Sequence, residues 1–167
     1  MIRFAMTTSA VVLLGACGGE APKPPVEKPQ TMVAGEYEVA SEVTMLASAD
    51  KTTPATRLKK GDKQTIRACV APDGTPDQAM FVEAGDKCTA TNSYSRSGRL
   101  SVQYTCTRAG KGDLNLNADG NYTADSFKVL VTGGSSFPGD GDYTLTRTLT
   151  AKRLGACPAG GATSPEA

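Results

Sequence analysis

Histidine and tryptophan are absent from the 167-residue sequence. Imidazole is the usual general base near neutral pH and a favoured zinc ligand, so Ser-His and Cys-His nucleophilic catalysis is excluded. An excess of charge is also missing: there are 18 Lys and Arg and 17 Asp and Glu residues, and Arg3 lies in a segment that we expect to be removed, which leaves 17 of each sign. This balance argues against nucleic-acid binding and against a broad basic membrane patch.

No apolar run has the length of a membrane-spanning helix. The run from Phe4 to Ala16 has 13 residues, or about 20 Å as a helix, against a hydrocarbon core of roughly 30 Å. It follows Arg3 and ends with Leu-Gly-Ala directly before Cys17, which is typical of a secretory signal and resembles a bacterial lipobox. We therefore expect residues 1–16 to be a lipoprotein signal peptide and Cys17 to carry acyl chains such as palmitate, which anchor the protein in the membrane. The alternative is an ordinary signal peptide with an incidental cysteine.

The segment after Cys17 is rich in proline and has no apolar periodicity. Residues 18–31 read "GGEAPKPPVEKPQT", so we expect 17–33 to be a lipidated tether that could hold the domain up to about 43 Å from the bilayer. In the lipoproteins that this segment resembles, an Asp after the lipidated cysteine indicates retention in the inner membrane; Gly18 stands at that position, so the resemblance implies the outer membrane, on its periplasmic side. Residues 34–157 form the predicted domain, and 158–167 a disordered tail.

Period-2 alternation dominates residues 34–157 and predicts a mainly β fold. We expect an antiparallel meander of about seven strands, folded as a curved sheet or partial barrel with one short helix in "TPDQAMFVEAG". In "DYTLTRTLTAKRL" a threonine ladder alternates with a mostly apolar face. In "YEVASEVTM" one face carries five side chains: Tyr37, Val39, Ser41, Val43 and Met45.

Three turn regions can be predicted in more detail. A three-residue loop Arg96-Ser97-Gly98 would pair Tyr94 with Leu100, Asn92 with Val102, Ala90 with Tyr104 and Cys88 with Cys106. We expect the hairpin in "DLNLNADGNYTADSFKVLV" to turn near Asp119-Gly120. The stretch "TGGSSFPGDGD" reads as a long surface loop in which Phe137 is a candidate contact point.

Four cysteines remain once Cys17 is acylated, and an even number in an oxidising compartment indicates two disulfides. The hairpin register favours Cys88 with Cys106 and Cys69 with Cys157. The alternative is Cys69 with Cys88 and Cys106 with Cys157.

Together these landmarks resemble a bacterial family known only as domain of unknown function 3617. Its pattern has a Gly-x-Tyr/Trp-Glu-Val opening, Cys-x-x-Pro, a Cys-to-Cys hairpin, Gly-rich strand pairs and a terminal Arg-Leu-Gly-x-Cys. The corresponding residues here are "GEYEV" at 35–39, "CVAP" at 69–72, Cys88 and Cys106, "NADGNYTADS" at 117–126 and "RLGAC" at 153–157. The resemblance implies an exported envelope protein, often lipidated, and brings no known activity.

Candidate chemical sites fail on inspection of the sequence. Asp113, Asn115, Asn117 and Asp119 alternate as in a calcium loop, but Ala118 and Ala124 occupy the positions that need Gly and Glu. Glu36, Glu38 and Glu42 share a strand face, which predicts a solvated surface. We expect no metal, no cofactor and no catalysis, and we favour a binding or interaction module for an envelope protein or hydrophobic ligand. The alternatives are a passive structural protein and a carboxylate-based envelope enzyme.

Overall fold

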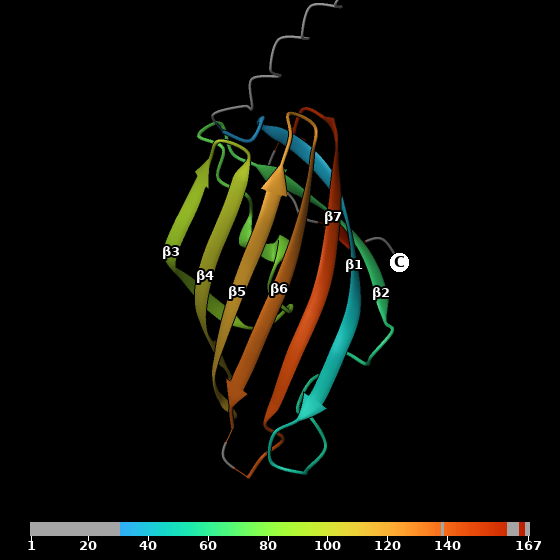
Figure 1. Ribbon diagram of the computed structural model, residues 1–167, viewed down its shortest axis with the longest axis vertical. Coiled ribbons are helices and arrows are strands. Elements are labelled where there is room, and N and C mark those ends of the chain that lie inside the picture. Colours follow the sequence, from blue (N-terminus) through green and yellow to red (C-terminus); the bar gives the residue numbers. More distant parts are fainter. Residues whose placement is uncertain (1–30, 138, 160–163, 166–167) are drawn as a thin grey trace, which may run out of the picture.

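The computed structural model describes residues 31–137, 139–159 and 164–165, so the predicted signal peptide, Cys17 and most of the tether lie outside the described residues. One antiparallel sheet runs in the order β3-β4-β5-β6-β7-β1-β2-β8 (Figure 1). Seven long strands and almost no helix confirm the predicted curved β-sheet. The strands are β1 (Gly35–Ser48), β2 (Lys63–Val70), β3 (Lys87–Arg96), β4 (Arg99–Arg108), β5 (Gly112–Tyr122), β6 (Ser126–Ser136), β7 (Tyr143–Gly155) and the two-residue β8 (Ser164–Pro165).

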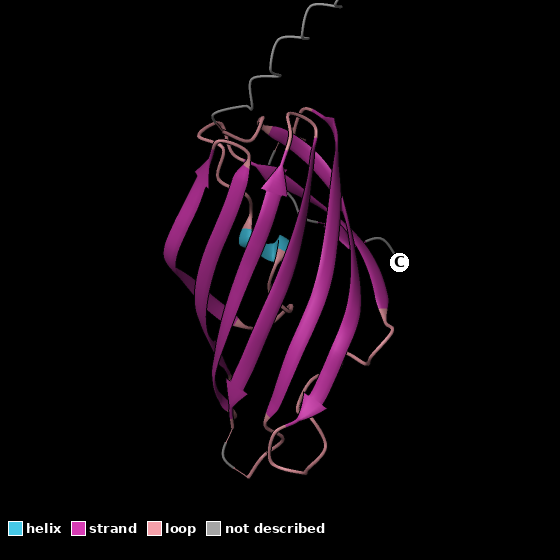
Figure 2. Ribbon diagram, viewed as in Figure 1, coloured by secondary structure: helices cyan, strands magenta, loops and turns pink. Residues whose placement is uncertain are grey.

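One face of the sheet is apolar and forms the core. Alternate residues of the strands supply it, as in β7, where Tyr143, Leu145 and Leu149 are buried and the intervening threonines face outward. The connection between β2 and β3 lies against this face and contains the single 3-10 turn η1 (Gln78–Met80) (Figure 2). The residues that cover the face from outside the strands are Met32, Leu58, Met80, Phe81 and Phe137.

The single turn η1 is shorter than the predicted helix and begins later. Its N-cap is Asp77, whose carboxylate accepts a hydrogen bond of 2.9 Å from the Ala79 amide. Pro76 lies before the turn, in an isolated bridge with Val70. No helix among the described residues has the length and apolarity to cross a bilayer.

The β3–β4 hairpin departs from the prediction in two places that offset each other. Its loop has two residues, Ser97 and Gly98, with φ of 52° and 76°, as a type I′ turn requires. Arg96 therefore pairs with Arg99, and the predicted partners of Tyr94 and Asn92 are wrong. An extra residue at Thr91 then forms a β-bulge, which restores the predicted pairs Ala90–Tyr104 and Cys88–Cys106.

A second bulge changes which face β1 presents. The register of β1 against β7 shifts between Val43 and Met45, and such a shift by one residue exchanges the two faces of a strand. Tyr37 and Val39 are buried as expected, whereas Met45 is 42% exposed. Leu46 packs against the core instead.

The predicted turn at Asp119-Gly120 is wrong, and the predicted loop over residues 132–142 is shorter than expected, since only residues 137–142 lie between β6 and β7. Strand β5 continues through Gly120 to Tyr122, and β6 continues through Gly133 and Gly134 to Ser136. Phe137 is fully buried, with its ring centroid 6.1 Å from that of Tyr143. It is therefore a core residue and does not serve as a surface contact.

Gly120 lies inside β5 because the neighbouring strand approaches it closely. A Cβ at this position would lie 2.1 Å from the carbonyl oxygen of Lys128 and 2.7 Å from Cα of Val129. A Cβ at Gly134, also inside a strand, would meet only the carbonyl oxygen of Tyr143 at 4.0 Å. Backbone atoms cannot give way as the end of a side chain can.

We predict that Gly120→Ala lowers the free energy of unfolding by about 2 kcal/mol, since β5 and β6 must separate to admit the methyl group. Gly134→Ala is the matched control and should leave the stability within about 0.5 kcal/mol of wild type. Urea denaturation followed by circular dichroism measures both. Equal effects of the two substitutions would contradict the close approach at Gly120.

Candidate binding surfaces

The inner face of the sheet is filled by the protein itself. Phe81 is fully buried, with its ring centroid 6.1 Å from that of Tyr104 on β4 and 6.2 Å from that of Phe127 on β6. Met80 is buried beside it. The centre of the curved sheet is therefore packed as a core and does not form a ligand cavity.

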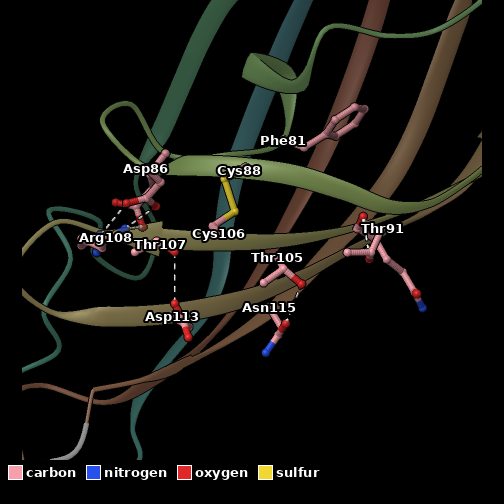
Figure 3. Close-up of a disulfide and its surroundings, with 12 residues drawn as sticks. Phe81, Asp86, Cys88, Thr91, Thr105, Cys106, Thr107, Arg108, Asp113 and Asn115 are labelled. Atoms are coloured by element: carbon pink, nitrogen blue, oxygen red, sulfur yellow. Dashed lines mark hydrogen bonds and ion pairs between the residues drawn. A yellow bond between two sulfur atoms is a disulfide. The ribbon is translucent and has the colours of Figure 1, made fainter.

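An ionic cluster fixes the connection between β2 and β3 to the end of β4. The Arg108 guanidinium donates two hydrogen bonds of 2.7 Å to the carboxylate of Asp86 and lies 3.0 Å from a carboxylate oxygen of Glu83 (Figure 3 shows Arg108 with Asp86). The Asp86 side chain is only 3% exposed. Hydrogen bonding to Asp86, aided by Glu83, raises the pKa of Arg108 against the effect of burial.

Aromatic rings complete this cluster. The Arg108 guanidinium carbon lies 5.8 Å from the ring centroid of Phe137 and 6.0 Å from that of Tyr143, within the range of cation–π attraction. Burial, with a contribution from Glu83, raises the pKa of Tyr143 to about 12. The neutral phenol donates a hydrogen bond of 3.2 Å to Glu83. Each charge thus has partners within the fold, which indicates a structural role.

Arg147 is more deeply buried than Arg108 and lies on the inner face of β7. It is 5% exposed, and its Nη2 donates a hydrogen bond to the carbonyl oxygen of Phe81. Its Nε has no hydrogen-bond partner among the described residues. Burial lowers the pKa of Arg147, while the charge of Glu83 opposes the shift. Alternation places Arg147 on this face, but no signal in the sequence distinguishes a buried arginine from one at the sheet margin.

The four cysteines of the domain form Cys88–Cys106 and Cys69–Cys157, the two pairs favoured from the sequence. Cys88 and Cys106 face each other on β3 and β4 with Cα atoms 3.9 Å apart (Figure 3). Cys69 at the end of β2 joins Cys157, which follows β7, so this bond passes over the start of β1. Cys17 lies outside the described residues.

The carboxylates considered from the sequence do not converge on one point. Glu42 lies 3.6 Å from Lys63 across the sheet, and Glu38 is opposite Arg67 on one side and Lys152 on the other. On β5, Asp113 accepts a hydrogen bond of 3.1 Å from Thr107. Within the described residues, no three His, Cys, Asp or Glu side chains are grouped as metal ligands.

The outer face and one edge of the sheet remain open. Among the strands of residues 31–137, 139–159 and 164–165, β3 is the first in the order and pairs only with β4, and Tyr94 on it is 48% exposed. At the opposite edge β2 pairs with β8 through Ile66 and Arg67. Two hollows of about 410 and 380 Å³ lie at opposite ends, the first beside Gly139–Gly141 and the second beside Lys128.

Comparison with known families decides the membership of the chain. The model of the family described as protein of unknown function DUF3617 matches residues 28–157. The chain belongs to this family. Neither the curated proteins nor the solved structures contain a match to it. The resemblance predicted from "GEYEV" to "RLGAC" is confirmed, and the match spans β1 to β7 of this DUF3617 domain with both disulfides.

The two disulfides of the DUF3617 domain should differ in their effect on stability. They close loops with sequence separations of 88 and 18 residues, for which chain entropy gives about 4.5 and about 3 kcal/mol. We predict that the Cys69→Ala/Cys157→Ala variant loses more stability in urea than the Cys88→Ala/Cys106→Ala variant. The reverse order would show that packing at the buried Cys106 outweighs the loop entropy.

Arg108→Met should destabilise the DUF3617 domain by about 3 kcal/mol, because it leaves the nearly buried Asp86 and Glu83 without a counter-charge. Lys111→Met is the matched control: it removes an ion pair with Asp140 (N–O distance 2.7 Å) that is exposed to solvent. The control should lose less than about 1 kcal/mol. Thermal and urea unfolding of both variants measure the difference, and equal losses would contradict a structural role for the cluster.

Proposed function

We propose that the protein is a non-catalytic module, anchored in the bacterial envelope through acylated Cys17, that binds a protein partner along the free edge of β3. The observation that carries the proposal is this edge: β3 (Lys87–Arg96) pairs with β4 on one side only. The sequence Leu-Gly-Ala-Cys before a proline-rich segment supports the anchor.

The unpaired edge of a strand presents a row of backbone hydrogen-bond donors and acceptors to a second chain. The two-residue loop makes Arg96 and Arg99 a hydrogen-bonded pair, so alternation makes Ser93–Val102 a non-hydrogen-bonded pair whose Ser93 amide points outward. Ser93 and its neighbours Asn92 and Tyr94 are exposed. The edge is therefore accessible to the backbone of a partner strand.

Natural edge strands carry features that prevent pairing, and β3 has two of them. The bulge at Thr91 interrupts the edge, and the cations Lys87 and Arg96 stand at its two ends. If two copies of β3 paired antiparallel along their whole length, Lys87 would face Arg96 at both ends. These like charges disfavour a second copy and favour a partner strand with acidic residues at its ends.

The interior of the curved sheet is filled by the protein's own side chains. This supports binding at the edge of β3 and argues against a ligand site on the concave face. Phe81 and Met80 occupy the position that a hydrophobic ligand would need. The acidic side chains Glu38 and Glu42 face cations on neighbouring strands. Neither arrangement offers an acid–base pair around a substrate cavity.

We predict that a photo-reactive benzoylphenylalanine in place of Tyr94 cross-links to a partner protein in intact cells. Ser93→Pro should abolish the cross-link, because proline removes the outward amide while remaining tolerated at a sheet edge. Ser93→Thr keeps the amide and is the matched control. Cross-linked products that are unchanged by Ser93→Pro, or absent from the control, would contradict binding along the edge.

The anchor has a separate test. Mass spectrometry of protein purified from its own membranes without reductant should show a chain that begins at Cys17 and carries acyl mass. In cells, Cys17→Ser should release the protein from the sedimented membrane fraction. A chain that starts elsewhere or carries no lipid would contradict the anchor and leave the edge proposal standing.

A further inference from the structure

A row of cations crosses the outer face of the sheet near one end. The register places Arg96, Arg99, Asn121, Lys128 and Thr150 directly opposite one another on the consecutive strands β3 to β7. Their neighbours Leu100, Tyr122, Phe127 and Leu149 are buried, so alternation directs the row to the solvent side. Hereafter Arg96, Arg99 and Lys128 are called the cation row.

The cation row lacks charge compensation. Arg96 and Arg99 are a directly opposed pair, an arrangement that destabilises a sheet when the charges are alike. In the part of the chain that the structure describes, no carboxylate forms an ion pair with any of the three. Asp119, two residues before Asn121 on β5, accepts a hydrogen bond from the side-chain amide of Asn117. A pair of like charges lowers stability, and such a pair without a counter-charge from the same fold is typical of a binding surface.

A hollow with mainly apolar walls lies beside the row. Its volume is about 380 Å³, and its lining includes Tyr122, Phe127 and Ala151 as well as Lys128. Ammonium and guanidinium groups are donors that bind phosphate oxygens. The exposed cations of the row, and not the hollow, therefore provide the site for a phosphate-bearing group.

The position of the row relative to the chain entry indicates where that phosphate lies. The β3–β4 turn, the β5–β6 turn and the start of β1 share one end of the sheet, and the chain that leads toward Cys17 enters there (Figure 1). The opposite end carries the β4–β5 turn and the β6–β7 connection. The cation row is thus at the end of the domain that the tether joins.

We infer that the cation row binds the phosphate groups of anionic phospholipids in the membrane that holds the anchor. The domain then lies with this end on the bilayer. The inference rests on the proposed anchor for its geometry. Near an anionic surface each cation contributes a factor of about five to binding, so three cations give about 100-fold.

The absence of tryptophan provides a clean test. Ala124→Trp places a single indole in the exposed β5–β6 turn beside the row, and Ala109→Trp places one in the exposed β4–β5 turn at the other end. The full-length protein with its anchor is reconstituted into vesicles of phosphatidylcholine alone or with phosphatidylglycerol, with bromine on the acyl chains as quencher. We expect strong quenching at position 124 in anionic vesicles only, and little quenching at position 109 in either.

Charge variants test whether the quenching in anionic vesicles depends on the cation row. Arg96→Gln/Arg99→Gln/Lys128→Gln should reduce the ratio of docked to undocked protein about 100-fold, and raised salt should act in the same direction. Arg96→Lys/Arg99→Lys/Lys128→Arg should retain docking. The matched control Lys51→Gln/Lys59→Gln/Lys60→Gln removes the same charge from the exposed β1–β2 connection and should leave quenching unchanged.

Failure of the anchor and failure of the row give different results. Flotation with phosphatidylcholine vesicles at high salt reports the anchor alone, whereas salt-sensitive quenching at position 124 reports the row, even for a chain without acyl groups. Quenching that does not depend on the phosphatidylglycerol content, or that persists in the triple Gln variant, would overturn the inference. So would equal quenching at positions 109 and 124.

Discussion

A single sheet with one apolar face needs a second layer to cover that face, and in this protein the connection between β2 and β3 supplies it. Phe81 is the centre of this layer and contacts the aromatic rings of Tyr104 and Phe127. Two arginines hold the layer in place: the partly buried Arg108 binds the carboxylates of Asp86 and Glu83, and the buried Arg147 binds the carbonyl of Phe81. Because the interior serves stability, the edge and the outer face are the surfaces that remain for the proposed interactions.

The sequence predicted most of the strands because alternation is a local property. It also predicted the pairs Ala90–Tyr104 and Cys88–Cys106, although the loop was assigned one residue too long. The bulge at Thr91 compensated for that error. A bulge depends on how two strands twist against each other, and a single strand's pattern carries no sign of it. For the same reason the exposure of Met45 was not foreseen.

Most of the incorrectly predicted turns and loops contained glycine. Gly120 and the pair Gly133-Gly134 were assigned to turns and loops, whereas the structure has them inside strands. At Gly120 the cause is the approach of the Lys128 backbone, a contact between distant residues that local sequence cannot reveal. The burial of Phe137 under Arg108 is likewise a tertiary event. The candidate surfaces could be anticipated only in part: the sequence predicted a curved sheet, but the position of its open edge and the alignment of Arg96, Arg99 and Lys128 require the register.

The disulfide between Cys69 and Cys157 has a mechanical consequence. Glu36 at the start of β1 lies between Cys69 of β2 and Gly155 of β7, and the disulfide joins the two flanking strands across it. A pull on the N-terminal chain loads β1 along its length, against hydrogen bonds on both sides that must break together. The disulfide prevents β2 and β7 from separating at the start of β1, where the force is applied. A domain held by its N-terminal end can therefore bear tension without losing its first strand.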